Sequence, residues 1–152
     1  MTGSFAGRLI VAALFLAGPA IADPKLQALG ENGVVLAVIP MQEGREICLT
    51  WAHSVTAGKV ADCFENHTGQ LTLTRSYLHD FAAGLGEVEG RGRLTSDPRG
   101  GYWIMDMNEA MPDNRLALRT GAAEVGHRLV AGDESIALPL QTAVTLILTS
   151  TK

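Results

Sequence analysis

The sequence predicts an all-β fold, a single-domain antiparallel β-sandwich or partly open barrel of about eight to nine strands. Short runs rich in Val, Ile, Leu and Thr recur after residue 22, and Gly, Asp, Asn and Pro separate them. Several runs alternate apolar and polar residues, as a half-buried strand requires. Helical periodicity is hard to find in the same region. The fold class therefore follows from the spacing and the period of the apolar residues.

The expected strands follow one another with short turns. Their residue ranges are 34–39, 46–53, 59–66, 70–77, 102–107, 115–119, 127–131, 135–138 and 144–149. In the run "QLTLTRSY", strict alternation places Leu71, Leu73, Arg75 and Tyr77 on one face. The final run, "AVTLILT", is apolar on nearly both faces, which predicts a central or covered strand. Residues 80–101 are rich in glycine and are expected to form one long loop.

The first 22 residues have the order of a secretory signal peptide. Arg8 precedes an apolar run, a Gly18-Pro19 break follows, and Ala20-Ile21-Ala22 has the A-x-A pattern of a cleavage site. The alternative is a retained N-terminal anchor, although the apolar run is shorter than the roughly 20 residues that a membrane span needs. We therefore expect residues 1–22 to be removed and residues 23–152 to form one domain in the periplasm, with no membrane span after cleavage.

The composition argues against nucleic acid as a partner. The chain has 12 Lys and Arg against 16 Asp and Glu, and its formal net charge is −4. Proteins that bind phosphate backbones usually show the reverse balance. Aromatic residues make up only 5% of the chain, which also disfavours a base-stacking platform.

The stretch "EICLTWAHSVTAGKVADCFE" is predicted to be a hairpin closed by a disulfide. A turn within residues 54–58 places Cys48 opposite Cys63, at a separation from which a small approach of the strands permits a bond. Two cysteines in an exported chain favour this pairing. The alternative is a pair of free thiols in a metal or redox site, although their spacing is not C-x-x-C.

The same register predicts that His53 and Asp62 lie among apolar neighbours, on the face opposite the cysteines. They are then either a core histidine and a buried carboxylate satisfied by hydrogen bonds, or the polar groups of a ligand pocket. Adjacent strand residues point to opposite faces, so Ser54 is badly placed to use His53 as a base. The chain also has no G-x-S-x-G elbow.

Several short motifs occur in a characteristic order along the chain. They are "HSV" at 53–55, an acidic residue at Asp62 before an apolar one, "AGL" at 83–85, "NRLALRTG" at 114–121 and "GHRL" at 126–129. In this order the sequence resembles the family called domain of unknown function 1850. The resemblance implies a small exported accessory of a TAXI-type tripartite solute transporter, whose partner would be the permease or its solute-binding subunit. It implies no catalytic residues.

We therefore expect a binding protein rather than an enzyme, with no cofactor and no metal. The candidate ligand-binding residues are His53, Ser54, Asp62, Tyr77, Arg119 and His127. The alternative is a small periplasmic enzyme or metal-binding protein that uses His53 and His127. That alternative requires the two imidazoles to converge with an acid such as Asp62, because metal–nitrogen bonds are only about 2 Å long.

Overall fold

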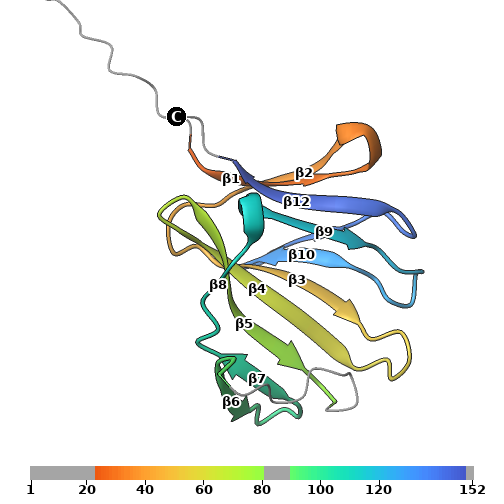
Figure 1. Cartoon of the computed structure of the whole chain (residues 1–152). Coiled ribbons are helices and arrows are strands. Elements are labelled where there is room, and N and C mark those ends of the chain that lie inside the picture. The colour runs from red at the N-terminus through yellow and green to blue at the C-terminus, as the bar shows by residue number, and fades with distance from the viewer. Residues whose placement is uncertain (1–22, 81–89, 150–152) are drawn as a thin grey trace, which may run out of the picture.

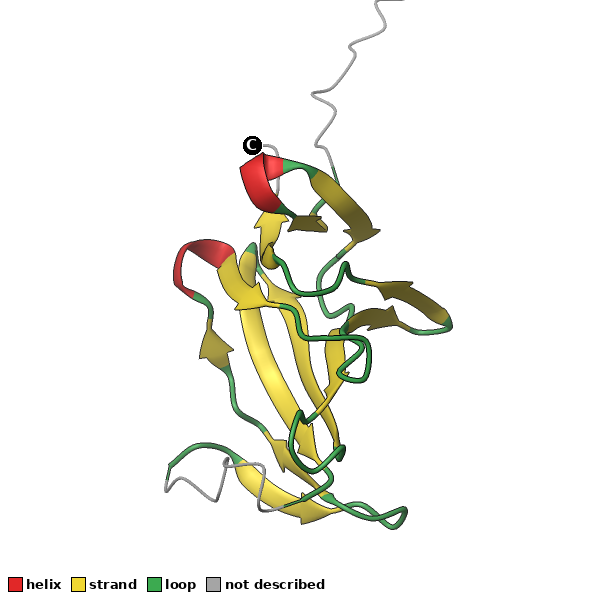
Figure 2. Cartoon of the chain, turned by 90° about the vertical axis from the view of Figure 1, so that its right-hand side faces the viewer, coloured by secondary structure: helices red, strands yellow, loops and turns green. Residues whose placement is uncertain are grey.

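The computed structural model describes residues 23–80 and 90–149, and it consists of two antiparallel β-sheets that do not close into a barrel (Figure 1). The predicted signal peptide, residues 1–22, lies outside the described residues. Two short 3-10 turns, η1 (Glu31–Gly33) and η3 (Pro112–Asn114), are the helical segments of the described chain and are red in Figure 2. No described helix has the length and apolarity to span a bilayer. The predicted all-β, sandwich-like class is confirmed.

The smaller sheet has four strands in the order β2-β1-β12-β9. Their bounds are β2 (Val35–Pro40), β1 (Lys25–Leu29), β12 (Ala143–Thr149) and β9 (Arg115–Arg119). β12 lies between β1 and β9, so the apolar final run occupies the central position that its composition predicts. Along β12 the inward side chains of Val144, Leu146 and Leu148 are buried, whereas the residues between them are partly exposed.

The larger sheet has the order β11-β10-β3-β4-β5-β7-β6, and β8 pairs separately with β5. Its bounds are β3 (Ile47–Ala52), β4 (Lys59–His67), β5 (Gln70–Leu78), β6 (Arg93–Ser96), β7 (Tyr102–Met105), β8 (Glu109–Ala110), β10 (Arg128–Ala131) and β11 (Glu134–Ala137). Gly132, with φ of 60°, lies in the turn between β10 and β11, where glycine accepts a positive φ without cost.

The hydrophobic core lies between the inward faces of the two sheets. Leu26, Ile39 and Leu146 contribute to it from the smaller sheet, and each is about 1% exposed. Ile47 and Leu129 contribute from the larger sheet and are equally buried. Burial of such side chains stabilises a fold by about 1.5–3 kcal/mol each, before conformational entropy is subtracted. The outward face of the larger sheet takes no part in this core and is free to carry a site.

The strand count predicted from the sequence is too low, because the described residues form twelve strands. β1, β6 and β8 were not expected. β6 lies inside the stretch 80–101 that was predicted to be one loop, so that prediction is wrong at Arg93–Ser96, whereas residues 81–89 lie outside the described residues. All four β6 residues are exposed, so the strand has no apolar alternation to reveal it. It is held by backbone pairing to β7.

A β-bulge corrects the predicted alternation of β5. The register between β4 and β5 shifts between Cys63 and Phe64. Leu73 therefore pairs with Phe64 in the core, whereas Arg75 pairs with Cys63 on the outward face. Because a bulge inserts one extra residue, side chains on its two sides point to opposite faces of the sheet. The prediction that Leu71, Leu73, Arg75 and Tyr77 share one face is therefore wrong, and the bulge turns Arg75 and Tyr77 outward.

Candidate functional site

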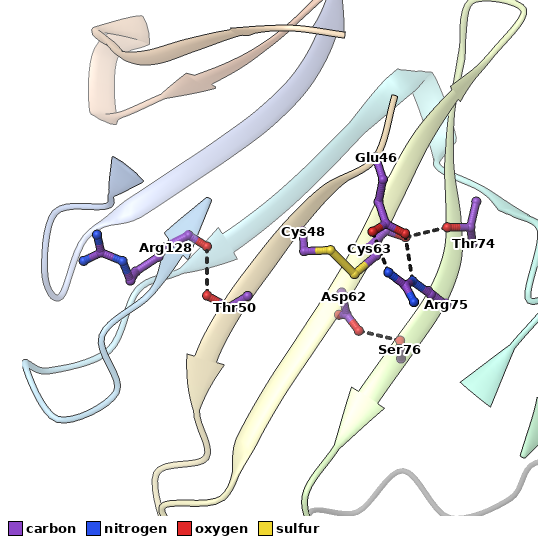
Figure 3. The surroundings of a disulfide bond; sticks show 9 residues. All are labelled: Glu46, Cys48, Thr50, Asp62, Cys63, Thr74, Arg75, Ser76 and Arg128. Carbon is purple, nitrogen blue, oxygen red and sulfur yellow. Dashed lines mark hydrogen bonds and ion pairs between the residues drawn. A yellow bond between two sulfur atoms is a disulfide. The ribbon is translucent and has the colours of Figure 1, made fainter. Parts of the chain in front are cut away.

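The predicted disulfide between Cys48 and Cys63 is present and joins β3 to β4 (Figure 3). The two residues are directly opposed, with Cα atoms 4.0 Å apart, and the neighbouring pairs Trp51–Val60 and Ile47–Phe64 follow the predicted register. Cys63 is fully buried. Glu46 and the two cysteines are the one group of three metal-ligand types that the described chain gathers, and the disulfide uses both sulfurs.

A row of outward side chains crosses four strands beside the disulfide. Thr50 on β3 pairs with Ala61 on β4, Ala61 pairs with Tyr77 on β5, and Tyr77 pairs with Trp103 on β7. A second row lies two residues away on β3, β4 and β5. In it Cys48 pairs with Cys63, and Cys63 pairs with Arg75. The first row thus has a small, flat half on β3 and β4 and an aromatic half on β5 and β7.

This row belongs to the lining of an open groove with a volume of about 940 Å³. Three loops supply its other walls, namely Thr56–Gly58 at the β3–β4 turn, Asp97–Arg99 before β7, and Glu124–Gly126 before β10. Lys59, His79 and Asp80 add charged and polar groups at the ends of β4 and β5. The groove therefore combines apolar and aromatic side chains with a few charged groups, a composition that ligand sites commonly have.

The Trp103 indole is held from two directions. Arg75 places its guanidinium carbon 4.3 Å from the ring centroid. The indole N–H donates a hydrogen bond of 3.0 Å to Asp97. Arg75 is itself fixed by a bidentate pair of hydrogen bonds to Glu46, at 2.7 and 2.6 Å (Figure 3). A planar guanidinium held in this way stacks on an aromatic ring with little further loss of entropy.

Tyr77 packs against Trp103 with ring centroids 5.1 Å apart and an interplanar angle of 54°. Its hydroxyl donates a hydrogen bond of 2.8 Å to the carbonyl of Gly100. The next residue, Gly101, has φ of 76°, and a side chain there would lie 2.7 Å from the Tyr77 hydroxyl. The aromatic half of the groove is therefore preformed, and a glycine permits its close packing.

Asp97 provides a fixed negative charge at the groove. Its carboxylate accepts hydrogen bonds from the backbone and side chain of Arg99 and from Trp103. The hydrogen bonds from Arg99 hold the pKa of Asp97 well below its usual range. The Asp97 side chain is 6% exposed, whereas that of Arg99 is 86% exposed, so the cation is the accessible partner of the pair.

Asp62 lies on the opposite, inward face of β4 and does not line the groove. Its carboxylate accepts a hydrogen bond of 2.5 Å from Ser76, which is 2% exposed (Figure 3). Burial raises the pKa of Asp62 above its ordinary value of 3.8, and the hydrogen bond from Ser76 opposes this rise. The charges of Arg91 and Glu109 act on it in opposite directions. Asp62 is thus a satisfied polar residue at the edge of the core.

The raised pKa of Asp62 makes the stability of the protein depend on pH. The native state binds the proton more tightly than the unfolded chain, so stability falls as the pH rises from 3.8 through the higher native pKa. Asp62→Asn keeps an acceptor for Ser76 and removes this titration. We expect the variant to exceed the wild type in free energy of unfolding at neutral pH, the excess to shrink as the pH falls through the raised native pKa toward 3.8, and the difference to become constant below 3.8.

Urea unfolding across this pH range measures the difference, with Asp133→Asn in an exposed turn as the control. A constant difference between Asp62→Asn and the wild type at every pH would contradict the assignment.

His53 and Ser54 belong to the β3–β4 turn. His53 is half-buried, and its Nδ1 accepts long hydrogen bonds from the backbone N–H groups of Val55 and Thr56, at 3.4 and 3.3 Å. It lies outside the apolar core cluster in which the strand alternation placed it. Ser54 is exposed. His53 therefore orders the loop that forms one wall of the groove, and does not line the groove itself.

His127 and Arg119 occupy other parts of the molecule. The His127 ring stacks on Trp51 with centroids 5.7 Å apart, and its Nδ1 accepts a hydrogen bond from the Gly121 N–H. Burial lowers the pKa of His127, which favours the neutral ring. Arg119 lies on β9 of the smaller sheet and donates to the Gln141 carbonyl. His53, His127 and Asp62 form no three-ligand group in the described chain, so the geometry gives no support to a shared metal or catalytic centre.

Of the six candidate residues, only Tyr77 lines the groove. The sequence reasoning missed Trp103, Asp97, Arg99 and Lys59. One signal was available, since "SDPRGGYW" places a turn directly before two aromatic residues. Binding residues lie disproportionately on loops that a rigid scaffold positions, and this loop is held by the strand that follows it.

The sequence matches the family "domain of unknown function (DUF1850)" over residues 47–138. The match spans more than half of the chain, and it covers β3 to β11 with the groove between them. The protein therefore belongs to this family, as the order of its motifs predicts. Neither a curated protein nor a solved structure matches the chain.

Proposed function

We propose that this protein is an exported, non-enzymatic accessory protein that binds a component of a TAXI-type tripartite solute transporter through the groove of its larger sheet. The component is the permease or the solute-binding subunit. The observation that carries the binding role is the preformed aromatic surface of Tyr77 and Trp103, which is fixed by Arg75 and Asp97 and bordered by accessible cations.

The chemistry of the groove favours a protein partner with acidic and apolar groups. Lys59 on β4 and Arg99 in the loop before β7 are exposed at its border, and the aromatic rings of Tyr77 and Trp103 lie on the paired strands β5 and β7. Aromatic residues and arginine supply most of the binding energy at protein interfaces, because they bury large areas with few rotatable bonds. The groove is also open, as a surface that receives a protein segment has to be.

Two further features support export. The leader has the order of a signal peptide, and the Cys48–Cys63 bond is of the kind that persists in oxidising compartments such as the periplasm. The link to a tripartite transporter is what the family resemblance implies.

Co-purification from detergent-solubilised membranes tests this link. We expect the tagged protein to retain the permease or the solute-binding subunit when the transporter is expressed. Lys59→Glu combined with Arg99→Glu reverses both accessible cations and should reduce the retained transporter component by at least about tenfold, which corresponds to roughly 1.4 kcal/mol.

The control variant is Lys25→Glu combined with Arg115→Glu. It makes the same change in charge at two exposed residues of the smaller sheet. It should retain the transporter component as the wild type does. Recovery of the wild type alone, with the transporter present in the same membranes, would exclude the proposed partner. Equal losses in both variants would show that net charge, rather than the groove, governs the association.

A further inference from the structure

The strands of the smaller sheet carry positive charge and no negative charge. β2, β1, β12 and β9 contain Lys25, Arg115 and Arg119 but neither Asp nor Glu, whereas the strands of the larger sheet contain four carboxylates. The three cations are exposed, and none of them belongs to an ion pair among the described residues. The acidic residues that flank these strands lie beyond the strand ends, and they are Asp23, Glu31 and Asp113.

The pairing register places apolar side chains beside these cations on the outer face of the sheet. Arg115 pairs with Ile147 on β12, Ile147 pairs with Gln27 on β1, and Gln27 pairs with Val38 on β2. Directly opposed residues point to the same face of a sheet. One row therefore runs across all four strands from an exposed arginine to an exposed valine.

A β-bulge in β2 brings a second valine to the same face. The register shift in the β1–β2 pair leaves Leu36 as an extra residue, so Val35 and Val38 point to the same side although they are three residues apart. Val35 is 54% exposed and Val38 is 44% exposed. The bulge and Pro40 also discourage a further strand from pairing with this edge. The exposed valines are therefore best matched to a partner that contacts the face of the sheet.

Protection of open strand edges does not account for the charge of this face. Carboxylates protect an edge as cations do, and Lys25 lies on β1, which has a neighbouring strand on each side. The four strands contain no aromatic residue, whereas aromatic side chains commonly anchor one protein on another. Aliphatic side chains beside unneutralised cations instead complement an anionic lipid surface.

We infer that the outer face of the smaller sheet docks on an anionic phospholipid bilayer. Val35 and Val38 enter the boundary between headgroups and acyl chains, and Lys25, Arg115 and Arg119 bind lipid phosphates. No residue of this sheet lines the groove, and in Figure 1 β1 and β2 lie at the top of the molecule whereas β5 and β7 lie toward the bottom. Both surfaces can therefore be occupied at once, and the inference does not depend on the proposed transporter partner.

Co-sedimentation with unilamellar vesicles tests this inference. The protein purified from the periplasm should bind vesicles of phosphatidylglycerol and phosphatidylethanolamine in equal parts, and should stay in solution with vesicles of phosphatidylcholine alone. Arg115→Gln combined with Arg119→Gln removes two of the three cations and should lower the partition coefficient at least about tenfold. Val35→Thr combined with Val38→Thr keeps the β-branched shape and should lower it at least about threefold, because the hydroxyl groups oppose entry into the acyl boundary.

The matched control is Arg93→Gln combined with Arg128→Gln, which removes two exposed cations of the larger sheet. It should bind the anionic vesicles as the wild type does. Failure of the wild type to bind them would overturn the inference. Equal weakening by the two pairs of arginine substitutions would also overturn it, because net charge rather than this face would then govern binding. Binding only to vesicles that contain the reconstituted transporter would assign the face to a protein partner, and would overturn it as well.

Discussion

Replacing both cysteines, as Cys48→Ala with Cys63→Ala, is expected to lower the free energy of unfolding by about 3 kcal/mol. The bond closes a loop with a sequence separation of 15, and this cost is the chain entropy that the unfolded state regains when the loop opens. Cys63 is fully buried, so the lost sulfur contacts add to the effect. Urea unfolding followed by far-ultraviolet circular dichroism measures the change.

The wild type under reducing conditions is the control for this experiment. Once both thiols are free, its unfolding should move close to that of the double variant. A loss of less than about 1 kcal/mol in the variant would show that the hairpin does not depend on the cross-link. The result also concerns the groove, because the Cys48–Cys63 pair lies two residues from the Thr50–Ala61 pair on the same strands.

Gly101→Ala is expected to destabilise the protein by about 3 kcal/mol and to disturb the aromatic half of the groove. The residue has φ of 76°, a conformation that costs an L-residue about 1–2 kcal/mol. An added Cβ would also lie 2.6 Å from the Leu78 carbonyl oxygen and 2.8 Å from the His79 Cα. Relief of such overpacking requires backbone shifts that cost about 1–3 kcal/mol more.

Gly44→Ala separates these two contributions. Gly44 has φ of 70°, but a side chain there would meet no atom within 4 Å. We expect a loss of about 1–2 kcal/mol, with unchanged tryptophan fluorescence. Gly101→Ala should lose more stability and alter the fluorescence, because the displaced strand carries Trp103. Equal losses for the two variants would mean that the close packing behind Tyr77 contributes nothing.

The hairpin of β3 and β4 was predictable in detail because its determinants are local. A turn within residues 54–58 and two opposed cysteines define one register, and the observed pairs Cys48–Cys63 and Trp51–Val60 follow it. The central position of β12 was predictable for a similar reason, since a run that is apolar on nearly both faces is typical of a strand with a neighbour on each side.

The bulge of β4 and β5 was not predictable from alternation. The alternation of apolar and polar residues continues through the bulge without a break. The extra residue depends instead on the packing of Phe64 and Leu73 in the core. That one shift determines that Arg75 and Tyr77 face outward. The aromatic half of the groove then depends on contacts between distant residues, such as Arg75 with Trp103 and Glu46. Sequence order carries little information about these contacts.

Site-specific photo-crosslinking in intact cells tests the central claim, which is that the groove receives a transporter component. A photoreactive phenylalanine analogue at position 59 or 99 lies at the groove, whereas positions 117 and 143 are exposed on the smaller sheet. The account predicts a discrete adduct from positions 59 and 99 that mass spectrometry identifies as the permease or the solute-binding subunit, and none from positions 117 and 143. Adducts with that component only from the smaller sheet, or from no position at all, would contradict it.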